Sequence, residues 1–434
     1  MGPAGSEIDW GRPGEAITTL MALRHEIALG YEELERYQQA DKEFARVYAM
    51  SAERIATQGR TPVALENRAK ICHAWAMIKN RVETKEDEGM KLLEEAASLT
   101  REVLANQDTK PSRYRDGLVD MLALILQSIG KLHVDYGRIH AAADNFEKVI
   151  ELMEGILARI RSAPEYNALD QNLKDMRVIG WEITRDKARI GLAYMYIRMG
   201  RTEESFVLYE KVIEARRKVH DRRKDLSYLK LELAGTLGNY AQSLVWIGRL
   251  DKALQLQLES NDLLELIYNE DKKQAFNKRQ LSTAFYRSAI LMDLQAKTED
   301  YRKFLEKSRI LRQELVDGSP DKINKGNLLL VLARQGKVKE VQKILMQKDT
   351  PQGANEMDSL TTARAFAQLS RQSNGTARLD DINKGLMALE QALDKGFMDP
   401  FRISREPDLI PLRNEKRFQE LLLRLEKNAN VKLN

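Results

Sequence analysis

Residues 129–150 read IGKLHVDYGRIHAAADNFEKVI, and the pattern of this stretch recurs along the chain. Residues 192–213 read LAYMYIRMGRTEESFVLYEKVI, and residues 240–261 read YAQSLVWIGRLDKALQLQLESN. Each stretch predicts a helix, a tight corner at a glycine, and a second helix with a small residue five positions after that glycine. Because a small residue lets two helix backbones approach closely, the repeated unit is predicted to be a packed helical hairpin.

This hairpin resembles the tetratricopeptide repeat (TPR), in which helix pairs stack side by side into an array. The resemblance implies an all-α, right-handed α-solenoid of about eight TPR-like hairpins with a C-terminal capping segment. Successive repeats are spaced further apart than the ~34 residues of an ordinary TPR, which predicts long helices. The small or apolar residues that anchor the second helices are Ala40, Gly89, Ala142, Ser205, Ala253, Tyr301, Val341 and Gly385.

Four regions are expected along the chain. Residues 1–15, which open with MGPAGS, look like a flexible leader, and residues 16–317 form the main repeat array. Residues 318–396 are divergent repeats, interrupted by glycines and prolines at 318–320 and 351–353, and the array is expected to bend or loosen after residue 317. Residues 397–434 look like a cap for the exposed end of the stack. Five glycines are predicted to lie where helices end or corners turn: Gly130, Gly137, Gly200, Gly248 and Gly336.

The composition suits long amphipathic helices, since 31% of the 434 residues are charged and only 10 are proline. Basic and acidic residues number 70 and 65, so bulk charge does not indicate nucleic-acid binding. Cys72 is the only cysteine, which excludes an internal disulfide and a cysteine-rich zinc site. We found no run of ~20 apolar residues, and therefore expect no membrane segment and a cytoplasmic protein.

The end of the repeat region resembles the repeat arrays attached to bacterial eukaryotic-like serine/threonine protein kinases. The kinase half itself is missing, because the sequence has no glycine-rich phosphate loop, no HRD and no DFG. The five histidines are scattered and lie beside no metal-ligand pattern, so no enzyme activity, metal or cofactor is predicted. The residues that carry the resemblance are Gly396, Phe397, Asp408, Leu409, Leu412, Arg413 and Phe418.

The resemblance to TPR proteins also implies a binding face on the first helix of each hairpin. Asn239 stands where related repeats use an asparagine to hydrogen-bond a peptide backbone, and Arg287 stands where an arginine often meets a carboxylate. The clamp that holds chaperone tails is not expected, because its other positions read Ile190, Tyr194 and Thr283. The residues predicted to bind a peptide are Gln127, Lys131, Lys187, Tyr194, Arg198, Asn239, Gln242, Trp246, Tyr286 and Arg287.

Three functions are compatible with this pattern. The first is a noncatalytic scaffold that binds an extended peptide or a partner helix, in a narrower version the docking or sensory part of a bacterial signalling protein. The second is a small-molecule sensor with a pocket formed by Tyr194, Arg198, Trp246, Tyr286 and Arg287. The third is a structural spacer that assembles with itself. The sequence leaves the partner and the oligomeric state open.

Overall fold

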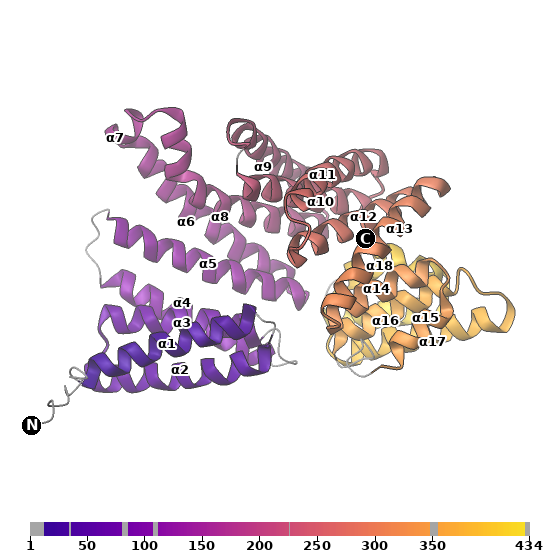
Figure 1. Cartoon of the computed structure of the whole chain (residues 1–434), viewed down its shortest axis with the longest axis horizontal. Helices are drawn as coiled ribbons and strands as arrows, with labels where there is room; N and C mark the ends of the chain where they lie inside the picture. The colour runs from indigo at the N-terminus through magenta and orange to yellow at the C-terminus, as the bar shows by residue number, and fades with distance from the viewer. Residues whose placement is uncertain are drawn as a thin grey trace, which may run out of the picture. The chain divides into compact units, whose positions relative to one another are not determined.

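The computed structural model describes residues 13–33, 36–79, 86–106, 112–224, 226–347 and 355–429. These residues form helices, with no β-strand among them (Figure 1). This confirms the predicted all-α fold built from TPR-like helical hairpins. Most of the predicted leader at 1–15 and the predicted break at 351–353 lie outside the described residues.

The chain divides into two compact units. Unit 1 comprises Met1–Leu132 and Asp144–Ala188, and unit 2 comprises His133–Ala143 and Arg189–Asn434. The division falls within the predicted array, because three long helices contribute residues to both units. These helices are α5 (Arg113–Asp135), α6 (Ile139–Ser162) and α8 (Gln171–Arg198).

Unit 1 contains the first two hairpins together with most of α5, α6 and α8. The small residues chosen as repeat anchors lie at the same point in each second helix: Ala40, Gly89 and Ala142 are the fourth residues of α2, α4 and α6. The remaining helices of unit 1 are α1 (Pro13–Glu33), α2 (Tyr37–Gln58), α3 (Pro62–Lys79), α4 (Glu86–Ala105) and the single turn α7 (Pro164–Asn167).

Unit 2 continues with hairpins and ends with short helices. Its helices are α9 (Thr202–Arg222), α10 (Ser227–Trp246), α11 (Leu250–Glu270), α12 (Ala275–Leu294), α13 (Thr298–Gly318), α14 (Lys322–Arg334), α15 (Val338–Leu345), α16 (Glu356–Leu369) and α17 (Gly375–Asp394). They are followed by α18 (Pro400–Arg405), the 3-10 helix η1 (Pro407–Leu412) and α19 (Lys416–Ala429).

Small and aromatic residues alternate in the core of unit 2 as the repeat pattern predicts. Ala253 is fully buried where α11 meets its neighbours. The rings of Tyr209 and Tyr240 stack with their centroids 4.8 Å apart, and both are almost completely buried. Burying each such side chain contributes about 1.5–3 kcal/mol relative to exposure, which favours stacked hairpins over isolated ones.

The corners between paired helices have left-handed backbone at the position that the glycine pattern predicts. Gly137, Gly200, Gly248 and Gly336 have φ values from 68° to 79°. The corner between α12 and α13 uses Ala296 instead, at φ 57°. A left-handed residue with a side chain costs about 1–2 kcal/mol, so this corner carries local strain.

Gly130 is an exception to the predicted role of the glycines. It lies inside α5 and not at a corner, so that prediction was wrong. A Cβ atom at this position would lie 2.9 Å from the ring of Phe146 on α6. Gly130 therefore serves close helix packing, which a sequence pattern cannot distinguish from a helix end.

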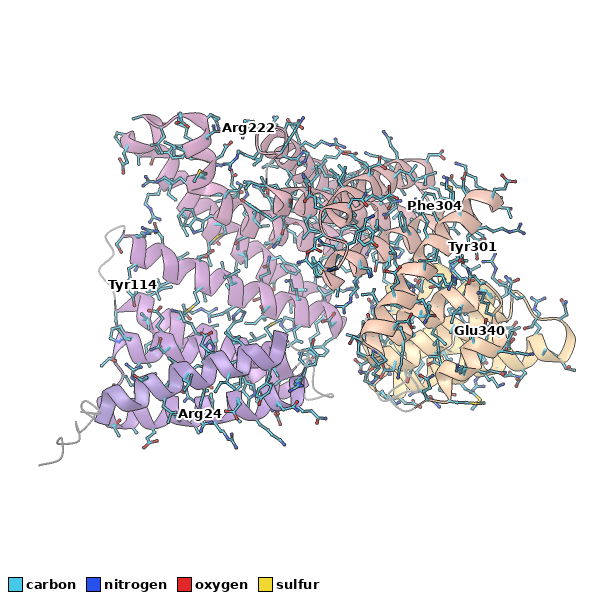
Figure 2. The ribbon with its side chains drawn as sticks, in the orientation of Figure 1. Arg24, Tyr114, Arg222, Tyr301, Phe304 and Glu340 are labelled. Carbon is cyan, nitrogen blue, oxygen red and sulfur yellow. The ribbon has the colours of Figure 1, made fainter. Side chains whose placement is uncertain are left out.

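Unit 2 was expected to bend or loosen after residue 317, and the helices on either side of that point are packed together. Tyr301 and Phe304 lie on α13 (Figure 2), and the Tyr301 hydroxyl donates a hydrogen bond of 3.2 Å to the backbone carbonyl of Arg334 on α14. The Asn324 N–H donates to Asp321 Oδ1 over 2.8 Å, which caps the start of α14. The break at 318–320 is thus a short connection between two packed helices.

Among the described helices, α5 alone is long and apolar enough to cross a membrane by length and composition. The sequence predicted no such segment, because no run of ~20 apolar residues is present. Half of its most apolar stretch is buried, with Leu118 and Ile125 almost inaccessible. A core helix of this kind passes the same test as a membrane helix.

Candidate functional site

The segment Phe397–Leu412, called the return segment, runs back across the first helices of the hairpins in unit 2. Asp399 begins its first turn, since the Arg402 N–H donates to Asp399 Oδ1 over 2.9 Å and Pro400 follows at the first helical position. Glu406 and Pro407 begin the 3-10 helix in the same way. Two acidic–proline pairs therefore make the segment fold into two short turns and not one long helix.

The return segment first meets the corner between α5 and α6. A Cβ atom on Gly137 would lie 2.0 Å from the carbonyl oxygen of Met398, so only glycine allows this contact. The next contact is at the end of α8, where Asp399 Oδ1 lies 2.7 Å from Arg198 Nη2. This is a buried ion pair, although no N–H of Arg198 is aligned for a hydrogen bond.

Aromatic packing on α10 follows. The Phe401 ring meets the Trp246 ring edge-on with centroids 5.6 Å apart, and Trp246 in turn packs on Tyr194 at 5.1 Å. Trp246 and Phe401 are each more than nine-tenths buried. Apolar contact and charge pairing thus alternate along the return segment.

Asp408 is the most enclosed charge of the return segment, with no exposed surface. Its carboxylate accepts a hydrogen bond of 2.9 Å from the Tyr286 hydroxyl, and lies 2.6 Å from Nη2 of both Arg334 and Arg364. Burial alone would raise the pKa of Asp408, but Arg334 and Arg364 lower it to about 2. Burial alone would lower the pKa of Arg334. The negative charge of Asp408 outweighs this effect and raises the pKa of Arg334 well above its ordinary value.

These contacts define a covered band on the first helices of unit 2. It consists of Arg198, Trp246, Tyr286, Arg334 and Arg364, all held against the return segment. Three of these five residues were predicted to face a partner: Arg198, Trp246 and Tyr286. The prediction that these three side chains are accessible was wrong, because Asp399, Phe401 and Asp408 of the return segment contact them. The small-molecule pocket proposed in the sequence shares these three side chains, so the return segment already covers that part of it.

A second, open band lies beside the covered one. It consists of Asn239 and Gln242 on α10 and Arg287 on α12. Asn239 is exposed, whereas Gln242 and Arg287 are half-buried. Asn239 precedes Trp246 by seven residues, so both lie on the same side of α10. A Cβ atom on Gly238 would lie 3.2 Å from Nη1 of Arg287, which places the guanidinium against α10 next to Asn239.

The electrostatic state of Arg287 differs from that of the covered arginines. In the part of unit 2 that the structure describes, its guanidinium forms no hydrogen bond and no ion pair. Burial lowers the pKa of Arg287, and weaker interactions with Tyr209, Tyr194 and Glu406 only partly offset this. A half-buried cation that forms no ion pair favours the approach of an anion.

The remaining predicted residues are Tyr194 in unit 2 and Gln127, Lys131 and Lys187 in unit 1. Tyr194 is half-buried behind Trp246 in unit 2. Gln127 is buried within unit 1, so its predicted exposure was wrong; it lies on the side of α5 that packs against neighbouring helices. Lys131 and Lys187 are exposed in unit 1 and remain predictions.

Sequence reasoning missed Arg334 and Arg364, which bind the return segment. Each stands within an apolar run, LLLVLAR at 328–334 and ARAFAQL at 363–369. A charge on the apolar side of a helix needs a buried counter-charge, and this signal could have pointed to a partner such as Asp408. The local sequence pattern does not show which carboxylate supplies this counter-charge.

No family model and no curated protein matches the chain. Among solved structures, the apo form of the quorum sensor NprR from B. thuringiensis is 14% identical over 86% of this chain and 87% of that chain, with a TM-score of 0.52. NprR in complex with its cognate peptide NprX is 16% identical over 83% and 85%, with a TM-score of 0.42. Yeast Tom70 is 12% identical over 96% and 71%, with a TM-score of 0.38. At these identities the NprR likeness shows a TPR-type fold alone, and the finer resemblance to kinase-attached arrays stays a prediction.

Proposed function

We propose that the protein is a noncatalytic interaction scaffold that binds an extended peptide with an acidic side chain across the open band of unit 2. The observation that carries this proposal is Arg287, a half-buried cation that forms no ion pair or hydrogen bond among the described residues, beside the exposed amide of Asn239. A carboxylate on the peptide would complete the charge of Arg287. Asn239 can both donate to and accept from a peptide backbone.

The return segment supports this assignment by its chemistry. On the neighbouring covered band, the same first helices already hold an irregular chain segment through carboxylate–arginine pairs and one aromatic contact. A peptide bound to the open band would use the same two kinds of interaction, carboxylate–arginine pairing and aromatic contact, at neighbouring positions on the first helices. The face therefore suits acidic, partly apolar peptides better than basic ones.

A signalling role is a narrower part of the proposal. It receives support from the fold shared with NprR, which is described as a quorum sensor. Reading the coding sequence next to this one would test it, since a kinase or regulator domain in the same transcription unit is the expected result. A cytoplasmic location belongs to the same proposal, and fractionation of the native cells would test it.

The proposal is tested with peptides selected from a random display library on the immobilised full-length chain. We expect the selected peptides to be enriched in Asp and Glu. The double variant Asn239→Ala, Arg287→Met should weaken their binding at least tenfold, with helical content and melting temperature unchanged. Methionine keeps an unbranched apolar stem like that of arginine and removes the guanidinium, with its charge and its hydrogen-bond donors.

A matched control distinguishes the open band from general surface charge. Lys218 on α9 is an exposed cation paired with Glu214 in the same helix, outside the open band. Lys218→Met removes the same charge as Arg287→Met and should leave peptide affinity unchanged. If the double variant and this control bind the selected peptides equally well, the open band is not the binding face.

A further inference from the structure

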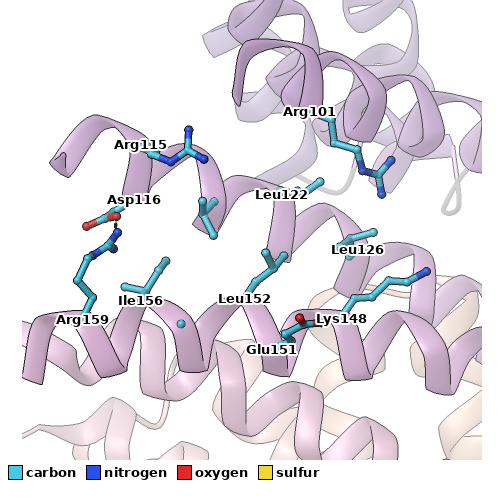
Figure 3. Close-up of a pocket in the computed structure, with 12 residues that line it drawn as sticks. Arg101, Arg115, Asp116, Leu122, Leu126, Lys148, Glu151, Leu152, Ile156 and Arg159 are labelled. Atoms are coloured by element: carbon cyan, nitrogen blue, oxygen red, sulfur yellow. Dashed lines mark hydrogen bonds and ion pairs between the residues drawn. The ribbon is translucent and has the colours of Figure 1, made fainter. Parts of the chain in front are cut away.

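A furrow in unit 1, between α5 and α6, is separate from the face described above (Figure 3). Its volume is about 610 Å³. The floor is formed by apolar side chains from both helices at helical spacing. They are Val119, Leu122 and Leu126 on α5 and Leu152 and Ile156 on α6. Spaced three or four residues apart, they make a continuous apolar strip.

One lining position of the furrow has no side chain and leaves open space beside it. Gly155 is exposed on α6, and no atom lies within 4 Å of the place where its Cβ atom would be. From Arg115 to Leu126 the lining on α5 extends over about 16 Å, at ~1.5 Å per residue. This length corresponds to about three turns of a helix.

Cations predominate around the furrow. Four basic and two acidic side chains line it, and one of the acids, Asp116, already forms an ion pair with Arg159. Arg115 uses one N–H to donate to the backbone carbonyl of Leu104 over 3.1 Å. Among the described residues, Arg101 and Lys148 form no ion pair or hydrogen bond. The rim therefore attracts a negatively charged occupant.

The apolar floor restricts the backbone of that occupant. The floor side chains carry no hydrogen-bond donor or acceptor, and the backbone groups beneath them are bonded within α5 and α6. An extended peptide would bury unpaired N–H and C=O groups against this floor, which is costly. A helix satisfies its own backbone groups and can turn an apolar stripe inward and a polar side to water.

We propose that this furrow binds an amphipathic helix of a partner protein, with apolar residues at helical spacing facing the floor and acidic residues beside them facing Arg101, Arg115 and Lys148. The site lies wholly in unit 1. It does not depend on the peptide face proposed for unit 2, so either site can exist without the other.

The test measures fluorescence anisotropy of two labelled helical peptides, each about 15 residues long, on the full chain. Both carry leucines at helical spacing; one has glutamates on both flanks and the other has lysines at the same positions. The glutamate peptide is expected to bind at least tenfold more tightly than the lysine peptide. Equal binding of the two peptides would overturn the charge assignment.

One substitution tests the furrow without harming the fold. Gly155→Leu fills the open position, and leucine favours a helix more than glycine does, so the melting temperature should hold or rise. Binding of the glutamate peptide should fall at least tenfold. Gly180→Leu is the matched control, because Gly180 lies exposed on α8 in unit 1, with no atom within 4 Å, and does not line the furrow.

Three outcomes would overturn the proposal. Unchanged peptide affinity in Gly155→Leu would place binding elsewhere. Saturable binding of decanoate by calorimetry, without binding of either peptide, would identify a site for a small amphiphilic anion. Self-association of the wild type that Gly155→Leu abolishes, measured by sedimentation, would identify a second copy of the chain as the occupant.

Discussion

Arg334 and Arg287 lie on the first helices of adjacent hairpins in unit 2, but their surroundings shift their pKa values in opposite directions. Arg334 is buried and paired with Asp408 and Asp293, and Asp408 raises its pKa well above the ordinary value. Arg287 has no such partner among the described residues, and burial lowers its pKa. The covered band pairs its charges within unit 2, whereas the charge of Arg287 in the open band forms no ion pair among the described residues and is the one we propose to bind an acidic peptide.

The largest expected effect comes from breaking the covered band at Asp408. Asp408→Ala would leave Arg334 and Arg364 buried with their main counter-charge removed, which typically costs about 3–5 kcal/mol. Urea unfolding followed by circular dichroism measures the loss of unfolding free energy.

The control is Asp380→Ala, because Asp380 is exposed and pairs only with Lys384 one turn away. Its effect should stay below about 0.5 kcal/mol. If the two alanine variants unfold at the same urea concentration, the return segment does not stabilise unit 2.

The second effect separates two corners that look identical in sequence. Gly137→Ala and Gly200→Ala both place a side chain at positive φ, which costs about 1–2 kcal/mol. Only at Gly137 does the added methyl also collide with the Met398 carbonyl, and overpacking typically adds about 1–3 kcal/mol. Gly137→Ala should therefore melt at a clearly lower temperature than Gly200→Ala in calorimetry, and equal melting would contradict the contact with Met398.

The third effect is the acid dependence of the covered band. The pKa of Asp408 is about 2 in the folded protein against 3.8 for an ordinary aspartate, so its ionisation stabilises the folded state above about pH 4. That stabilisation is lost as the pH falls from about 4 to about 2. Asp408→Asn should flatten the decline of stability in this range. A stability profile as steep as that of the wild type would show that other groups cause it.

The smallest expected effect concerns the stability of the open band. Arg287→Met removes a half-buried cation that forms no ion pair or hydrogen bond among the described residues, so the free energy of unfolding should stay unchanged or rise slightly. This sharpens the contrast with Asp408, since a residue kept for binding can be lost without harming the fold. A loss of more than about 2 kcal/mol would show that Arg287 is a structural residue like Arg334.

The repeat pattern predicted the hairpins well because local spacing determines them. The small residues at Ala142, Ser205 and Ala253 and the corners at Gly137 and Gly200 depend on contacts within one hairpin or between neighbours. Periodic packing and left-handed corners both restrict which residue types can occupy a position, so both can be recognised in the sequence. The second helices α6, α9 and α11 accordingly each begin three residues before their anchor residue.

The site was predicted less well, because it depends on contacts between residues far apart in the sequence. The register of the repeats was enough to place Asn239 and Arg287 on the first helices of their hairpins. It could not reveal that Phe401 would cover Trp246 or that Asp408 would reach Tyr286. The closing motif was noted in the sequence for its resemblance to other arrays, but its position against the first helices followed only from the structure.

The pairing of Arg198 with Asp399 has a consequence for synthesis on the ribosome. About two hundred residues separate the two, and a ribosome adding about 5–20 residues per second needs on the order of ten to forty seconds to cover that distance. During this interval the hairpins of unit 2 can form, but Arg198 has no carboxylate from the return segment to neutralise it. Nascent chains should therefore expose a cationic, aromatic surface that chaperones or early partners can reach, and that closes once translation passes Leu412.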